Sequence, residues 1–172
     1  MIDILRNRRS IRKYTEQAIE EEKLEVLKEA ALRSPSSKNI NPWEFIFVDD
    51  KESINRLKDC KLNGVTPLKT APLDIVVCAD ETKNDVCIED CSIASILLQL
   101  TAQSLGLGSC WIQVRNRMHS DELSSEKYIQ NLLGIPENFR VMSIITAGYP
   151  EQKREGKPIE ELQFEKIRVN MF

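Results

Sequence analysis

Several side chains near the N-terminus can donate a hydrogen bond to an anionic oxygen. They lie in the stretch Arg8-Arg9-Ser10-Ile11-Arg12-Lys13-Tyr14. An arginine guanidinium suits phosphate because its two parallel N–H donors match two oxygens. Crowding so many cations is unfavourable by self-repulsion unless an anion lies between them. The stretch therefore indicates a phosphate or carboxylate site, although a solvated basic turn would have the same composition.

A second polar stretch runs from Ser34 to Trp43, Ser34-Pro35-Ser36-Ser37-Lys38-Asn39-Ile40-Asn41-Pro42-Trp43. It combines hydroxyls, carboxamides and a lysine between an expected helix and an expected strand. Ligand contacts often lie in such loops. The same residues also suit ordinary turns, so this stretch alone does not identify a ligand.

A third stretch, Gly106-Leu107-Gly108-Ser109-Cys110-Trp111-Ile112-Gln113, follows the longest helical pattern. Its two glycines allow the backbone to approach a flat ligand closely, and Trp111 and Ile112 offer an apolar wall. It is not a dinucleotide fingerprint, because the GxGxxG spacing is absent and the order is helix then strand. A helix cap followed by a core tryptophan would explain it equally well.

Composition limits the classes of function that need to be considered. The chain has 172 residues, 41% hydrophobic, with a net charge of −3. We expect one soluble domain with no affinity for nucleic acid or an anionic membrane. No apolar run approaches the roughly 20 residues of a membrane span. Five cysteines without a CxxC pair, and a single histidine, favour reduced thiols in the cytoplasm and no metal site.

Hydrophobic periodicity predicts alternating helices and strands. The expected helices cover 2–7, a segment that opens at Thr15 or Ala18 and ends before Ser34, 51–60, 84–105 with Gly106 as its cap, and 121–133 capped by Ser120; the expected strands cover 44–49, 73–79, 109–114 and 141–149. The helix over 84–105 is apolar on nearly all sides, which suggests that it also lines a subunit interface. After Pro150 the chain is charged and then apolar again, so we expect its end to dock on a partner subunit.

In this order, the motifs RRSIRKY, SPSSKNINPWEF, APLDIVVCAD, GLGSCWI and ITAGYP resemble the nitroreductase family of FMN-dependent oxidoreductases. The resemblance covers nearly the whole chain. It implies a single nitroreductase-like FMN-binding domain over residues 1–172, with an α+β sandwich in which helices flank a central, mostly antiparallel sheet. It also implies a homodimer whose C-terminal segment is exchanged with the partner.

The resemblance further implies roles for individual residues in holding FMN. Arg8 and Ser10 match the residues that hold the phosphate and ribityl chain, with Arg9 adding its backbone, and Arg12 matches the cation at the pyrimidine edge. The partner's loop would cover the flavin through Pro35, Ser36, Ser37 and Asn39, and Trp111, Ile112 and Gln113 would pack on one flavin face. Lys153, Arg154 and Lys157 compete to close the phosphate site; we retain Arg154 and Lys157 as candidates.

The activity implied is hydride transfer from NADH or NADPH to FMN, followed by ping-pong reduction of a nitroaromatic, a quinone or a similar small-molecule acceptor. No side chain is expected to act as a catalytic acid or base, because the flavin N5 carries the chemistry. One alternative is a specialised enzyme of the same family, a reductive dehalogenase or a flavin-fragmenting enzyme. Another is a non-catalytic FMN-binding protein, and a third is a site for some other phosphate ligand.

Overall fold

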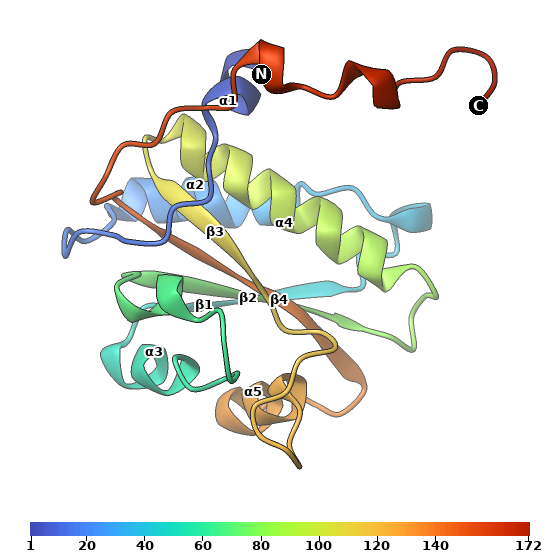
Figure 1. The fold of residues 1–172 in the computed structure, drawn as a ribbon. Coiled ribbons are helices and arrows are strands. Elements are labelled where there is room, and N and C mark those ends of the chain that lie inside the picture. The colour runs from blue at the N-terminus through green and yellow to red at the C-terminus, as the bar shows by residue number, and fades with distance from the viewer.

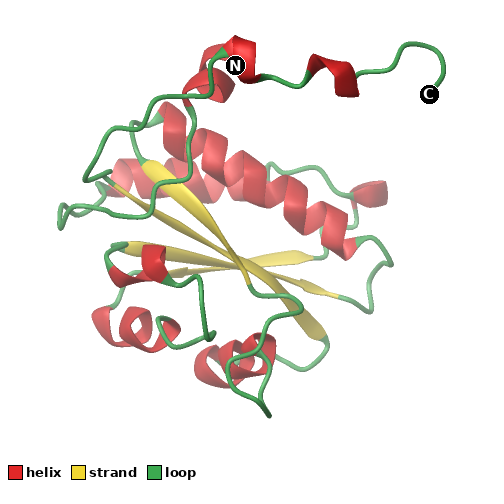
Figure 2. Cartoon of the chain, in the orientation of Figure 1, coloured by secondary structure: helices red, strands yellow, loops and turns green.

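A computed structural model describes all residues, 1–172, as one antiparallel sheet with helices on both faces (Figures 1 and 2). The helices are α1 (Ile2–Asn7), α2 (Glu21–Leu32), α3 (Lys51–Leu57), α4 (Cys87–Ser104) and α5 (Ser125–Leu133); the strands are β1 (Trp43–Val48), β2 (Leu73–Asp80), β3 (Gly108–Gln113) and β4 (Phe139–Gly148). Four short 3-10 turns complete it: η1 (Ser37–Asn39), η2 (Thr66–Lys69), η3 (Ile159–Glu161) and η4 (Phe164–Lys166).

The sheet has the order β1-β2-β4-β3, and every neighbouring pair is antiparallel. Helices α2 and α4 cover one face, and α3 and α5 cover the other (Figure 1). All eight residues of β2 are buried, because successive side chains of this central strand enter opposite cores. The expected α+β sandwich with an antiparallel sheet is confirmed.

The predicted elements are all present, but several begin or end elsewhere. Helix α2 begins at Glu21 and not at Thr15 or Ala18, because the backbone N–H of Thr15 is held by the carbonyl of Tyr149 in an extended segment. Helix α5 begins at Ser125, and its cap is Ser124, whose hydroxyl accepts from the N–H of Lys127.

Ser120, the cap predicted for that helix, instead accepts from the N–H of Leu123 and closes a local turn. Helix α3 ends at Leu57 and not at Cys60, and α4 begins at Cys87 and not at Asn84. Gly106 has a φ of 77° directly after α4, which is the left-handed conformation expected of a terminating glycine.

The C-terminal segment first runs back along the N-terminal stretch, and after η3 it projects away from the body of the protein (Figure 1). Its large apolar side chains are exposed to solvent: Ile159, Leu162, Phe164, Ile167, Val169, Met171 and Phe172. Helix α4 also leaves Ile88, Ile93 and Ile96 partly exposed on its outer side. Exchange of the tail with a partner stays a prediction. No helix is both long enough and apolar enough to cross a membrane.

Candidate functional site

The first and third sequence motifs meet along the free edge of β3. Ser10 forms a parallel bridge with Ser109, and the N–H of Ile11 donates to the carbonyl of Ser109 at 2.9 Å. Gly108 makes this approach possible, since a Cβ atom there would lie 2.6 Å from Cγ1 of Ile11. The motif Arg8–Tyr14 is therefore placed like an added strand, with its cations beside the end of the sheet.

Tyr14 anchors this added strand from inside the protein. Its buried hydroxyl donates to the carbonyl of Ile11 at 2.9 Å and lies 2.7 Å from Oγ1 of Thr146 on β4. Oγ1 of Thr146 is also 3.4 Å from the carbonyl of Cys110. Tyr14 and Thr146 thus tie the basic motif to β3, so that the tyrosine is a structural part of the motif.

The basic motif and Lys61 both lie along β3, because Ser10 is bridged to Ser109 and Lys61 is bonded to Gln113, on either side of Cys110. Burial raises the pKa of the Cys110 thiol, but the Arg12 guanidinium, a hydrogen bond with Ser10, and the charges of Arg8 and Lys61 all act to lower it. These groups come from the N-terminus and from the loop after α3. The combination of two guanidiniums, an ammonium and a hydroxyl is the donor set that an anionic, phosphate-bearing ligand requires.

Lys61 belongs to none of the three motifs, but it also lies against β3. Its Nζ donates to the carbonyl of Gln113, the last residue of β3, at 3.1 Å, and burial lowers the pKa of its ammonium. In the sequence Lys61 is one lysine in an irregular loop. Only the long-range contact with β3 distinguishes it from the surface lysines around it.

The strand β3 carries the three residues, Trp111, Ile112 and Gln113, that are expected to pack on one flavin face. The half-buried Trp111 donates from Nε1 to Oε1 of Gln113 at 2.9 Å, and Nε2 of Gln113 donates to the carbonyl of Arg115 at 2.9 Å. These bonds fix both side chains. The side chain of Ile112 is buried in the core on the α3 side, so it does not form the expected apolar wall and can offer only its backbone.

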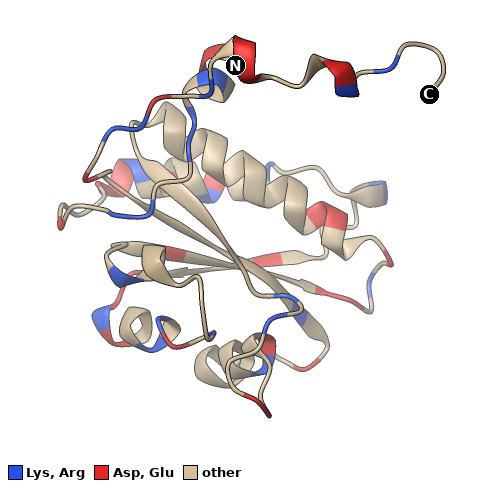
Figure 3. Ribbon diagram, in the orientation of Figure 1, with Lys and Arg blue, Asp and Glu red and all other residues tan.

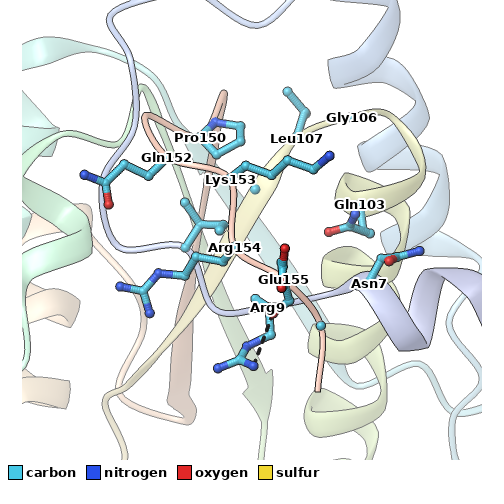
Figure 4. A pocket seen from close by; sticks show the side chains of 13 residues that line it. Asn7, Arg9, Gln103, Gly106, Leu107, Pro150, Gln152, Lys153, Arg154 and Glu155 are labelled. Carbon is cyan, nitrogen blue, oxygen red and sulfur yellow. Dashed lines mark hydrogen bonds between the residues drawn. The ribbon is translucent and has the colours of Figure 1, made fainter. Parts of the chain in front are cut away.

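The segment after β4 returns to the arginine motif. Arg9, Lys153 and Arg154 line a hollow of about 500 Å³ together with Gln103 and Asn7, and Nη1 of Arg9 donates to the carbonyl of Glu155 at 3.3 Å (Figure 4). Lys157 lines a neighbouring hollow of about 600 Å³ with Arg8 and Arg9. Basic residues of the arginine motif and of the segment after β4 lie close together where these two segments cross (Figure 3).

The second motif lies elsewhere, beside the first turn of α4. Here the buried Asp90 accepts from the N–H of Ser37 at 2.9 Å and from Nδ2 of Asn84 at 2.9 Å. Ser36 is hydrogen-bonded to Asn41, and both Lys38 and Asn39 have a positive φ. Pro35, Ser36, Ser37 and Asn39 therefore form an ordered loop, which we call the cover loop (Ser34–Asn41).

Within one chain the cover loop does not reach the basic motif. The loop is fixed to Asp90, whereas Gln103 near the other end of α4 lines the hollow that contains Arg9. At 1.5 Å per residue these two positions are about 20 Å apart along the helix. Figure 1 shows the same separation, with η1 at the start of α4 and the N-terminal segment at its end.

Comparison with known proteins agrees with this geometry. The Nitroreductase family model matches residues 5–82 and 59–149. An FMN-dependent nitroreductase from Clostridium difficile R20291 superimposes with a TM-score of 0.98, with 48% identity and full coverage of both chains. A protein of Archaeoglobus fulgidus, named for NADH dehydrogenase or NAD(P)H nitroreductase activity, is 36% identical over 90% of this chain and 87% of its own.

The NADPH:FMN oxidoreductase of Vibrio harveyi, in its complex with NAD⁺, has a TM-score of 0.83 and 26% identity, over 99% of this chain and 77% of that one. The similarities thus extend over the sheet, the arginine motif and the long helix together. The chain belongs to the Nitroreductase family.

Proposed function

We propose that this protein is an FMN-dependent NAD(P)H oxidoreductase. The observation that carries the proposal is that the basic motif Arg8–Tyr14 and Lys61 both lie against β3, through the bridge of Ser10 with Ser109 and the hydrogen bond of Lys61 to the carbonyl of Gln113. The relatives named above are nitroreductases and an NADPH:FMN oxidoreductase, which supports this cofactor and this donor.

The residues present fit an FMN molecule that lies along the edge of β3. Arg8 and Ser10, with the backbone of Arg9, would hold the phosphate, and Arg154 or Lys157 would close that end from the returning segment. Arg12 and Lys61 would lie by the pyrimidine edge, and Trp111 and Gln113 would orient the ring. FMN, when bound, supplies hydride acceptance from the nicotinamide and electron transfer to the second substrate.

In this arrangement the protein orients and polarises the flavin ring. No side chain of the site is assigned as an acid or a base. The cations at Arg12 and Lys61 would favour negative charge on the ring that they face, and Lys61 is held in place by the carbonyl of Gln113 before that charge develops. We infer ping-pong turnover, with a nitroaromatic, a quinone or a similar small molecule as the acceptor.

We further propose that the working unit is a homodimer of single domains, each spanning residues 1–172. One chain supplies β3 and the basic motif of the site, but its cover loop lies at the other end of α4, about 20 Å away along the helix. A second copy could bring Pro35, Ser36, Ser37 and Asn39 over the flavin of the first. The exposed apolar tail and the outer side of α4 provide surfaces for that association.

The test is the visible absorption spectrum of the purified protein, followed by NADH or NADPH without oxygen. We expect flavin bands that bleach on adding the nucleotide and return when a quinone is added. A protein that takes up no FMN would contradict the cofactor assignment. Bound flavin that no nicotinamide reduces would instead identify a binding protein without oxidoreductase activity.

A further inference from the structure

The loop that carries Lys61 is fastened to the segment after β3 on both sides of that lysine. The carbonyl of Asp59 accepts from Nδ1 of His119 at 2.6 Å, and the N–H of Leu62 donates to the carbonyl of Met118 at 3.2 Å. A carbonyl can only accept, so Nδ1 of His119 carries the proton. Residues 62–64 are exposed, so these hydrogen bonds determine where the loop lies.

His119 is itself held in place by its surroundings. Its backbone N–H donates to the carbonyl of Leu123 at 2.8 Å. Its ring stacks on that of Tyr128, with centroids 4.1 Å apart and an interplanar angle of 18°. Tyr128 belongs to α5, and its hydroxyl donates to the carbonyl of Arg56 at 2.9 Å. The two aromatic rings therefore hold two carbonyls at the end of α3, at Arg56 and Asp59.

We propose that His119, supported by Tyr128, is a positioning residue that sets the place of Lys61 in the flavin site. This inference rests on the proposed function, because it assigns Lys61 to the pyrimidine edge of FMN. Nζ of Lys61 reaches the carbonyl of Gln113 only while the loop is held against the β3–α5 segment. His119 is the only histidine of the chain, and its Nδ1 acts here as a hydrogen-bond donor to the carbonyl of Asp59.

The consequence is electrostatic. A cation that is fixed before reduction stabilises charge on the ring more than a cation that moves freely in water. Reduced flavin carries more negative charge at its pyrimidine edge than oxidised flavin, so loss of a fixed Lys61 lowers the midpoint potential of bound FMN. Release of the loop by removing the His119 donor should have the same sign as removal of Lys61 itself.

The experiment compares the midpoint potential of bound FMN in five forms of the full-length protein. Lys61→Met sets the scale. His119→Phe keeps a ring over Tyr128 but lacks the donor, whereas His119→Asn keeps an N–H donor near the position of Nδ1. Arg56→Ala is the matched control, because it removes an exposed nearby cation without changing the carbonyl that Tyr128 contacts. The fifth form is the native protein.

We expect His119→Phe to lower the potential by at least half of the Lys61→Met shift, and His119→Asn and Arg56→Ala to stay near the native value. Amide exchange at Leu62 in the FMN-free protein should accelerate in His119→Phe and not in Arg56→Ala. A native potential in His119→Phe, or no shift in Lys61→Met, would overturn the inference while leaving the oxidoreductase intact. Absence of FMN uptake by the native protein would instead contradict the proposed function.

Discussion

The two ends of helix α4 carry two different halves of the proposed flavin site. At its C-terminal end, the arginine motif, β3 and the returning segment are joined by hydrogen bonds within one chain, as those of Ile11 with Ser109 and Arg9 with Glu155 show. At its N-terminal end, the cover loop is equally well ordered by Asp90, but it faces no part of the site in its own chain.

This difference supports the proposed homodimer. A loop with positive φ values at Lys38 and Asn39 is conformationally costly, and such strain usually accompanies function. The C-terminal tail also lacks a packing partner within its own chain, since the apolar side chains of Phe164 and Ile167 are largely exposed. Variants can therefore test the two halves of the proposed site separately. One half, the arginine motif with β3, is complete within one chain, and the other, the cover loop, would need a second chain.

The largest effect is expected from charge in the apolar tail. Phe164→Glu combined with Ile167→Glu removes two apolar contacts per subunit and so four per dimer, each worth about 2 kcal/mol, so dimer affinity should fall by roughly 10⁵- to 10⁶-fold. Sedimentation velocity measures the dimer, and FMN binding should be lost with it. Lys166→Glu, on the same turn, is the control. A dimer that persists in the double variant would show that the tail is not the association surface.

The next largest effect is expected on the stability of the sheet that carries the site, at Asp74. Asp74 is fully buried on β2, neither of its carboxylate oxygens has a partner, and burial raises its pKa well above the ordinary value. A raised folded-state pKa means that its contribution to stability is present below about pH 4 and is lost as the pH rises toward the folded pKa.

Asp74→Asn should therefore match the native protein near pH 4 and become more stable than it above that, by up to about 1.4 kcal/mol per pH unit. Urea unfolding at pH 4, 5, 6 and 7 measures this. In Asp80 the hydrogen bond from Thr82 lowers the pKa, so its contribution to stability is fully present above about pH 4, and Asp80→Asn should be less stable than the native protein by the same amount at all four pH values. Parallel curves for the native protein and Asp74→Asn would mean that Asp74 is not a buried neutral acid.

A smaller effect is expected at the phosphate end of the proposed site. Arg8→Ala removes a charge-assisted hydrogen bond worth about 1.5–3 kcal/mol, so FMN affinity should fall by roughly 10- to 150-fold while the dimer persists. Fluorescence titration of FMN into the stripped protein measures it. Arg6→Ala, whose side chain pairs with Asp3, is the control. Equal FMN affinity in both variants would remove Arg8 from the phosphate site.

The sequence alone predicts the four strands, and the family resemblance of its motifs implies the fold class. The alternating pattern of β1 and the apolar run of β2 contain that information locally. The start of α2 is not local, since Thr15 is held extended by Tyr149, far along the chain.

The same limit applies to the site. Arg8, Ser10 and Arg12 stand in one compact motif, so the family resemblance implies a role for each of them. Lys61 and Asp90 act through Gln113 and Ser37, which are distant in sequence, and neither lies in a motif of its own. Ile112 shows the reverse error: its neighbours predict a ligand wall, but the alternation of β3 directs its side chain into the core.

The smallest expected effect sharpens the comparison at the other end of α4. Asn84→Ala removes the donor to Oδ2 of Asp90 but leaves the bond between Asp90 and Ser37, so the cover loop should lose about 1 kcal/mol of stability. Amide exchange at Ser37 should rise about fivefold in the FMN-free protein. If the cover loop closes the partner's site, FMN affinity should fall by a similar factor. Asn55→Ala, an exposed carboxamide on α3, should change neither value. Faster exchange with unchanged FMN affinity would show that the loop is ordered for a purpose other than covering the flavin.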